Sequence, residues 1–167
     1  IGISNASEAD LREYLKFGPV DAIQECYSAL DRGIETTLLP ICKTEGVSCL
    51  SYSSMALGLL SGRMTPTRQF EGDDQRKNNP RFSVDNRKKV ADFFADIEPL
   101  CSQYQATPGQ LIIAWTLQQP GITYALCGAR NPSQAAENAR AGEVELSAAD
   151  CAHIEAARAK HLSDIDG

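Results

Sequence analysis

The sequence predicts an α/β fold built on a parallel β-sheet. Short apolar runs with strand character alternate with longer segments whose apolar residues recur at helical spacing. Several of the helical segments open with a Ser, Thr or Asn cap, which marks where each helix starts. Alternation of this kind produces right-handed βαβ units and parallel strands. The four expected strands are half the number in an eight-stranded barrel.

The first segment of the chain reads as strand, helix, strand. Residues 2–3 end a short strand, and Ser7 followed three residues later by Asp10 has the pattern of a capping box. We expect the helix after this box to run to about Phe17. The apolar run over residues 20–26 predicts the second strand.

The same order is repeated before a long irregular segment. Helical spacing predicts a helix from Ile34 to Glu45, and the run over residues 47–52 predicts the third strand. From Ser53 to Arg81 the periodicity lapses and several Gly and Pro residues appear. Because long loops in compact domains are usually functional or disordered, this segment is a candidate lid.

The C-terminal half continues the alternation. Its helices have recognisable starts at Thr107 with Pro108, at Asn131 with Pro132, and at Ser147. The expected helices and strand cover residues 90–104, 108–118, 122–127 (the strand), 132 onward and 148–161.

Composition and charge exclude several classes of protein. No run approaches the roughly 18 apolar residues of a membrane span. The net charge of −6 is spread along the chain and gives no electrostatic reason to bind nucleic acid or an anionic membrane. The six cysteines stand far apart without a metal-ligand pattern. We therefore expect reduced, mostly buried thiols, no metal and a cytoplasmic location. The opening residues show no export signal, and the missing initiator Met suggests that the natural N-terminus lies upstream.

One stretch has the features of an anion site. The fourth strand ends near Gly128 and leads into a capped helix, which brings unpaired N–H groups and the positive end of the helix dipole together. Arg130 offers a planar fork of donors to a phosphate. Gln134, Glu137 and Asn138 follow on the first turns of that helix, where they can face an adenine or ribose. The alternative is that Gly128 only shapes a turn and that Arg130 is a solvated surface charge.

A second stretch, residues 51–62, also follows a strand. Tyr52 offers a flat face to an aromatic ligand, and Gly58 allows the backbone to approach a pyrophosphate. Taken with residues 1–5, Gln24 and residues 128–138, this stretch resembles the aldo-keto reductase family in order and spacing. The resemblance spans nearly the whole chain. It implies that residues 1–167 form the C-terminal half of one NADP-dependent oxidoreductase barrel domain, from the fifth to the eighth strand of a (β/α)8 barrel.

The resemblance also implies roles for individual residues in binding NADP. Ser4, Asn5 and Gln24 would bind the nicotinamide carboxamide, and Tyr52 would stack on the ring. The remaining implied contacts are Ser53, Leu57, Gly58, Ser61 and Gly62 along the pyrophosphate and ribose, Gly128 at the end of the fourth strand, Arg130 and Gln134 at the 2′-phosphate, and Glu137 and Asn138 at the adenine. The residues themselves also allow Ser4 to be a turn residue and Gln24 to be a buried core amide. The family more often has Pro at position 54, where this chain has Ser54.

The family's catalytic Asp, Tyr, Lys and His belong to its second to fourth strands, so the resemblance implies no catalytic residue in this chain. His153 and His161, the two histidines, both fall in the last helix. We expect the whole enzyme to reduce an aldehyde or ketone and the 167 residues alone to be inactive. The exposed sheet edges would require the N-terminal half of the barrel or a second copy as partner. The alternative function is a non-catalytic half-barrel module that binds a nucleotide or a partner.

Overall fold

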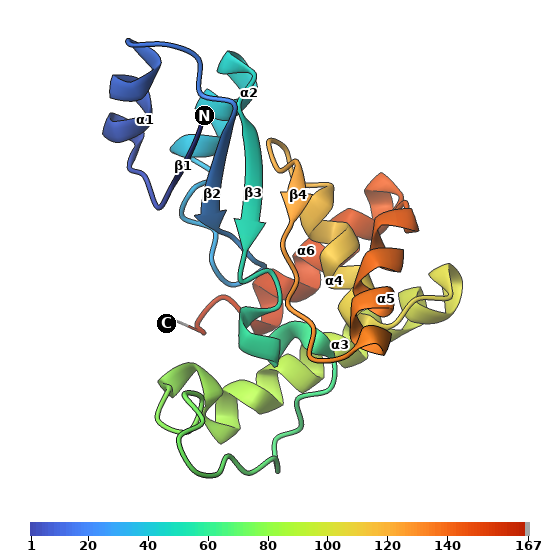
Figure 1. Cartoon of the computed structure of the whole chain (residues 1–167). Coiled ribbons are helices and arrows are strands. Elements are labelled where there is room, and N and C mark those ends of the chain that lie inside the picture. Colours follow the sequence, from blue (N-terminus) through green and yellow to red (C-terminus); the bar gives the residue numbers. More distant parts are fainter. Residues whose placement is uncertain (166–167) are drawn as a thin grey trace. The chain divides into compact units, whose positions relative to one another are not determined.

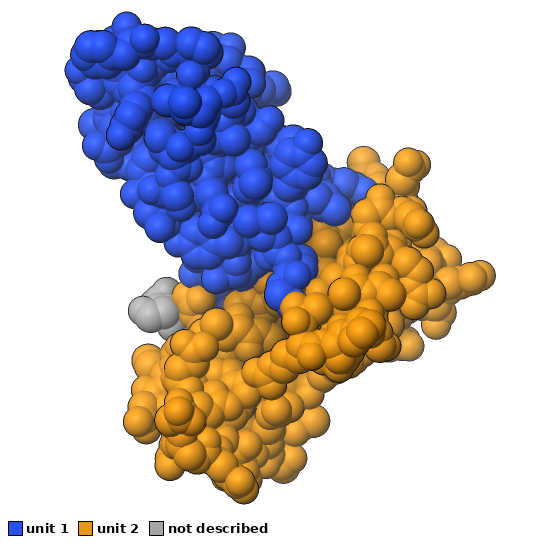
Figure 2. Space-filling view, in the orientation of Figure 1, with its two compact units in different colours: residues 1–54, 116–128 blue, residues 55–115, 129–167 orange. Residues whose placement is uncertain are grey.

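The computed structural model describes residues 1–165, and Figure 1 shows the helices and strands in chain order. The chain forms two compact units, coloured separately in Figure 2. Unit 1 comprises residues 1–54 and 116–128, and unit 2 comprises residues 55–115 and 129 onward. No helix within the described residues is long and apolar enough to cross a membrane.

Unit 1 contains a parallel sheet with the strand order β1-β2-β3-β4. Figure 1 shows the four strands side by side. The elements are β1 (Gly2–Ser4), α1 (Glu8–Leu15), β2 (Ala22–Cys26), α2 (Leu38–Glu45), β3 (Ser48–Tyr52) and β4 (Tyr124–Ala125). The expected α/β fold with four parallel strands is therefore confirmed. β4 is shorter than the expected range, although the N–H groups of Thr123 and Leu126 continue its pairing with β3 at 2.9 and 2.7 Å.

The strand register separates a buried face of the sheet from a more open one. Ile23 and Cys49 lie opposite each other and are both fully buried. Because successive side chains point to opposite faces, the neighbouring Gln24 lies on the other face, where it is exposed. Ser4 is paired with Gln24, and Tyr52 is paired with Cys26 one step along the same face. The open face therefore carries three of the expected cofactor contacts.

The two helices of unit 1 follow their local sequence signals. At α1, Ser7 Oγ accepts the N–H of Asp10 at 3.2 Å and the Asp10 carboxylate accepts the N–H of Ser7 at 2.9 Å, which confirms the capping box. α2 begins at Leu38, so the expected start at Ile34 is wrong. A helix from Ile34 would place Pro40 in its interior, where proline removes a backbone donor, whereas the observed start keeps Pro40 in the first turn.

Unit 2 is mainly helical, and α3 packs against α6. Its elements are η1 (Ala56–Ser61), η2 (Pro80–Phe82), α3 (Val84–Tyr104), α4 (Pro108–Leu117, whose last two residues belong to unit 1), α5 (Pro132–Arg140), η3 (Ala141–Glu143) and α6 (Ala148–His161). α3 starts six residues before the expected Val90, because Ser83 Oγ accepts the N–H of Asn86 at 3.2 Å and caps the helix.

The long segment after β3 is irregular apart from two short 3₁₀ turns, as expected. Part of it is held by Arg87 of α3, which is buried. Arg87 Nη1 donates to the carbonyl oxygens of Thr65 at 3.0 Å and Arg68 at 2.7 Å. The guanidinium also lies 5.4 Å from the ring centroid of Phe70, which packs edge-on against Phe82. These contacts fix residues 65–70 to the helix that follows the segment.

Candidate functional site

The open face of the unit 1 sheet brings together Ser4, Asn5, Gln24 and Tyr52. Ser4 Oγ donates to the carbonyl oxygen of Gln24 at 3.0 Å, so its hydroxyl stabilises the junction of β1 and β2. Gln24 is exposed in the described part of the chain. Residues from three strands thus present two amides, a hydroxyl and an aromatic ring within one unit.

Asn5 and Tyr52 form a direct pair on this face. The Tyr52 hydroxyl donates to Asn5 Oδ1 at 2.6 Å. Burial and the nearby acidic groups raise the pKa of Tyr52, so its hydroxyl is a donor at neutral pH. Since Oδ1 of Asn5 accepts this bond, the side-chain NH₂ is the part of the amide available for donation. Asn5 itself is in the left-handed region at φ 53°, an uncommon conformation for a residue with a Cβ.

Sequence reasoning missed Glu25, which lies on the buried face of β2 beside Gln24. Its side chain accepts the N–H of Ala6 at 2.8 Å. Burial raises its pKa, although hydrogen bonds from the main chain of Ala6 and Asn5 act in the opposite direction. The sequence does carry a signal for Glu25: the alternation of side chains along the strand assigns this position to the core, where a carboxylate is unusual.

The departure from the family pattern at position 54 has a local explanation. Ser54 is fully buried, and its hydroxyl lies 3.1 Å from that of Ser51. Ser51 Oγ also donates to the carbonyl oxygen of Tyr124, which connects β3 to β4. Ser53, between them, is half-buried and left-handed at φ 59°. The serines therefore support the end of β3 with polar contacts.

In unit 2, η1 carries the expected pyrophosphate contacts on an unusual backbone. Leu57 and Gly58 have φ values of 54° and 87°, and Leu57 is 46% exposed. A Cβ on Gly58 would meet nothing within 4 Å, so space is open beside it. Ser61 Oγ donates to the carbonyl oxygen of Gly58 at 2.6 Å. Gly62 has a packing role, since a Cβ there would lie 2.4 Å from that of Pro108.

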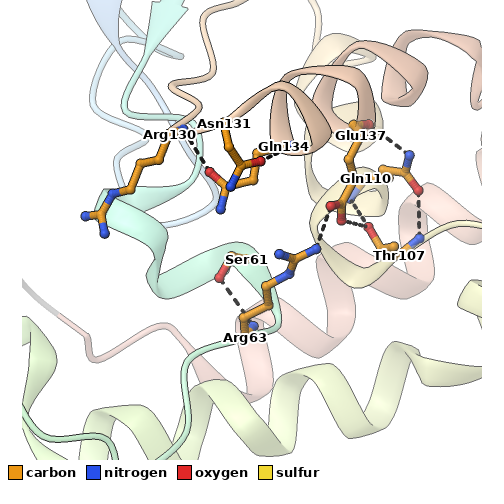
Figure 3. A network of polar contacts seen from close by, with 8 residues as sticks. All are labelled: Ser61, Arg63, Thr107, Gln110, Arg130, Asn131, Gln134 and Glu137. Atoms are coloured by element: carbon orange, nitrogen blue, oxygen red, sulfur yellow. Dashed lines mark hydrogen bonds and ion pairs between the residues drawn. The ribbon is translucent and has the colours of Figure 1, made fainter.

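The start of α5 has the expected cap, and Figure 3 shows its side chains. Asn131 Oδ1 accepts the N–H of Gln134 at 2.9 Å. Gln134 Oε1 in turn accepts the main-chain N–H of Arg130 at 2.8 Å. The Arg130 side chain is exposed and extends away from α5 in Figure 3. This arrangement leaves the Arg130 guanidinium accessible to a ligand. Gly128, which belongs to unit 1, is also exposed, and a Cβ there would meet nothing within 4 Å.

Glu137 belongs to a network of polar contacts within unit 2, also shown in Figure 3. Its carboxylate accepts hydrogen bonds from Arg63 Nη2 at 2.5 Å and Thr107 Oγ1 at 2.9 Å. Gln110 Nε2 donates to the main-chain oxygen of Glu137 at 2.9 Å. These bonds tie α5 to the start of α4 and to the residue after Gly62. The carboxylate keeps further acceptor positions, because two oxygens offer about four lone pairs. Asn138, the next residue, is half-buried.

The cysteines differ in burial from the expectation. Cys42 and Cys49 are buried, but the other four are only half-buried. Burial raises the pKa of Cys42 to about 11 and that of Cys49 to about 12, so both are thiols rather than reactive thiolates. Within residues 1–165, no group of three or more His, Cys, Asp and Glu side chains is placed to hold a metal ion.

Comparison with known proteins gives a consistent assignment. The sequence model of the aldo/keto reductase family matches residues 1–159. The NADH-specific methylglyoxal reductase of Escherichia coli is 41% identical over 150 residues, which are 90% of this chain and 45% of that protein. The aldo-keto reductase YhdN of Bacillus subtilis is 35% identical over 135 residues, covering 80% of this chain and 41% of the relative.

Among solved structures, the glycerol dehydrogenase of Gluconobacter oxydans superimposes with a TM-score of 0.89 at 26% identity. That match covers 98% of this chain and 50% of the other. The chain spans less than half the length of the two curated relatives. The matched family model and these relatives show that the chain belongs to the aldo/keto reductase family.

Proposed function

We propose that the protein is an NADP-dependent oxidoreductase that reduces an aldehyde or ketone to an alcohol, and that these residues supply most of its cofactor contacts. Family membership supports the reaction class. The observation that carries the proposal is the Asn5–Tyr52 pair beside Gln24 on the open sheet face. When bound, the dinucleotide supplies the hydride that the carbonyl carbon accepts.

The residues of unit 1 suit the nicotinamide end of a dinucleotide. The Asn5 NH₂ can donate to the oxygen of a carboxamide, because its Oδ1 already accepts the Tyr52 hydroxyl. The exposed Gln24 amide offers both a donor and an acceptor to the same group. The Tyr52 ring provides a flat apolar surface. Together these groups would orient the ring that carries the hydride.

The residues of unit 2 suit a phosphate. The accessible Arg130 guanidinium precedes the N-terminus of α5, where helix geometry favours an anion. This supports NADP as the cofactor, with Arg130 and Gln134 at the 2′-phosphate. The E. coli relative is named as NADH-specific, so NADH is the competing cofactor, and Arg130 is the residue on which the choice depends.

The proposal assigns orientation of the cofactor, rather than acid–base chemistry, to these 167 residues. A proton must reach the carbonyl oxygen as hydride reaches its carbon, and the acid–base residues implied by the family resemblance have no counterpart among the motifs matched here. We therefore propose that the N-terminal half of the barrel, or a second copy, completes the site. A cytoplasmic location forms part of the same proposal.

The experiment follows cofactor oxidation by the full-length protein with a panel of aldehydes and ketones that includes methylglyoxal, as the name of the E. coli relative suggests. Wild-type protein should consume NADPH, whereas Tyr52→Ala should raise the Kd for NADPH. Tyr52→Phe, which keeps the ring, should have a smaller effect. Tyr14→Ala, a change at an exposed tyrosine of α1, is the matched control. If the protein neither consumes nor binds NADPH or NADH, this result would contradict the proposed function. It would favour a non-catalytic module.

A further inference from the structure

The buried carboxylate of Glu25 lies directly behind the proposed nicotinamide contacts. We infer that Glu25 is a positioning residue, whose hydrogen bonds to the turn after β1 set the direction of the Asn5 side chain. The inference rests on the proposed function, since Asn5 is assigned there to the cofactor. It concerns residues of unit 1 alone.

The position of Glu25 follows from the alternation of β2. Its side chain lies on the buried face and is only 5% exposed, while its neighbour Gln24 faces the open side. From this position the carboxylate accepts the N–H of Ala6 at 2.8 Å. Glu25 therefore reaches the turn that carries Asn5 from the face opposite to the proposed ligand.

The turn at Asn5 is left-handed. Its φ of 53° is uncommon for residues with a Cβ, although asparagine adopts it more readily than most, and the surrounding contacts help to hold it. Two main-chain donors tie the turn to β2: the N–H of Asn5 to the carbonyl of Gln24 at 3.2 Å, and the N–H of Ala6 to Glu25. Removing the Glu25 carboxylate would leave the Gln24 carbonyl, which accepts the Asn5 N–H at 3.2 Å and the Ser4 hydroxyl at 3.0 Å, to hold the main chain of the turn against β2.

The backbone of Asn5 determines where its amide lies. The amide oxygen accepts the Tyr52 hydroxyl at 2.6 Å, a contact between residues 47 positions apart in the chain. If the turn relaxes, this bond lengthens and the Asn5 NH₂ loses its fixed direction. Small displacements of a positioned group weaken the interactions it makes with a ligand. Glu25 would thus influence the cofactor without touching it.

Burying a carboxylate costs free energy, so core packing alone does not favour one at this position. Burial raises the pKa of Glu25, which shows that the site disfavours its charge. An apolar side chain would fill the same space without that cost but would offer no acceptor to the turn. The acceptor oxygen is therefore the property that distinguishes Glu25 from an ordinary core residue.

The test compares three variants of the full-length protein. Glu25→Leu removes the acceptor, and Glu25→Gln keeps one. Glu35→Leu removes another part-buried carboxylate of unit 1, which accepts hydrogen bonds from the Tyr27 hydroxyl and Arg32, and is the matched control. Equilibrium titration measures binding of NADPH and of 2′-phospho-ADP-ribose, which lacks the nicotinamide. If the wild type prefers NADH, NADH and ADP-ribose replace these ligands.

Glu25→Leu should raise the Kd for NADPH roughly tenfold and change that for 2′-phospho-ADP-ribose by less than about twofold. Glu25→Gln should recover most of the NADPH affinity. Glu35→Leu should lower the melting temperature without this selectivity. The double variant Asn5→Ala/Glu25→Leu should bind NADPH no more weakly than Asn5→Ala, because both changes remove the same contact.

Three results would overturn the inference while leaving the proposed function intact: unchanged NADPH affinity in Glu25→Leu, equal losses for both ligands, or a Glu25→Gln variant that folds normally but binds NADPH tenfold more weakly. If Glu25→Leu does not fold, the NADPH affinity of Glu25→Gln still tests the inference. Failure of the wild type to bind either dinucleotide would instead contradict the proposed function, and the inference with it.

Discussion

Among single residues, Arg130 is the one on which the proposed preference for NADP over NAD depends. Its guanidinium is exposed, and its main chain is fixed by the bond to Gln134. Arg130→Ala should weaken NADPH binding by about 1.5–3 kcal/mol, because charge-assisted bonds to the 2′-phosphate are lost. NADH binding should remain nearly unchanged. Titration of both cofactors checks this, with Arg140→Ala at the other end of α5 as control. Equal losses for both cofactors would remove Arg130 from the phosphate site.

Glu25 gives a prediction about stability and pH. Burial raises its pKa in the folded state above that in the unfolded chain, so the folded state binds the proton more tightly. Stability should therefore fall as the pH rises from the ordinary carboxyl range through the raised pKa. Glu25→Gln should remove this part of the pH dependence. Denaturant unfolding of both proteins between about pH 4 and 7 measures it, and identical slopes would contradict the assignment.

The sequence anticipates the residues of the candidate site better than their contacts. Asn5, Gln24 and Tyr52 could be named because their order and spacing in the chain resemble those of the aldo-keto reductase family. The Tyr52–Asn5 bond could not be predicted, since it depends on the register of strands far apart in the chain. The bonds from Arg63 and Thr107 to the Glu137 carboxylate could not be predicted either, because they depend on the packing of α5 against residues 74 and 30 positions away in the chain.

At the level of single elements, Gly58 in η1 and Gly62 directly after it are both left-handed but differ in the space around them. Gly62 is at φ 71°, and a Cβ there would lie 2.4 Å from that of Pro108, whereas Gly58 is at φ 87° with open space around it. Gly62→Ala should therefore cost about 2–4 kcal/mol of stability, from backbone strain and overpacking together. Gly58→Ala should cost about 1–2 kcal/mol, from the backbone alone.

Denaturant unfolding of the two glycine variants separates these contributions. If both variants lose the same free energy of unfolding, the close approach of Gly62 to Pro108 makes no additional contribution to the loss of stability. A Gly58→Ala variant that is less stable than Gly62→Ala would contradict the assignment of open space beside Gly58.

The long segment from Ser53 to Arg81 yields a prediction about local motion. We expect fast hydrogen exchange over most of it without cofactor and slower exchange with NADPH, as for a lid. Residues 65–70 should exchange more slowly than the rest, because Arg87 binds the carbonyls of Thr65 and Arg68. Arg87→Met should remove that difference. Strong, uniform protection of the whole segment without cofactor would identify it as a packed structural element.

Element types could be predicted from the sequence, but several boundaries could not. The sequence predicts the alternation of strands and helices, and also the caps at Ser7 and Ser147, because these features depend on residues close together in the chain. Apolar periodicity alone starts α2 too early, because Pro40 limits how far the helix can extend toward the N-terminus. It starts α3 too late, because the cap formed by Ser83 starts the helix six residues before the first apolar residue of the periodic pattern. Both boundaries depend on nearby residues, to which capping and proline rules apply.

At the scale of the whole molecule, the sheet order has a consequence for the 167 residues produced alone. β1 and β4 are the outer strands of the described sheet, and each presents unpaired backbone groups at its edge. We expect the isolated chain to associate or to be poorly soluble, and not to oxidise NADPH in the presence of aldehydes. Light scattering after size exclusion and a cofactor assay test this. A monodisperse monomer with ordinary turnover would contradict it.

The proposed function requires the full-length protein to transfer hydride from a dinucleotide to a carbonyl. It is tested most directly with NADPH carrying two deuterium atoms at C4 of the nicotinamide, mixed with the protein and methylglyoxal, and with mass analysis of the product. We expect an alcohol with one deuterium on the former carbonyl carbon, formed at a rate that falls in Tyr52→Ala. An alcohol without deuterium, or no alcohol with NADPH, NADH or any carbonyl of the panel, would contradict it.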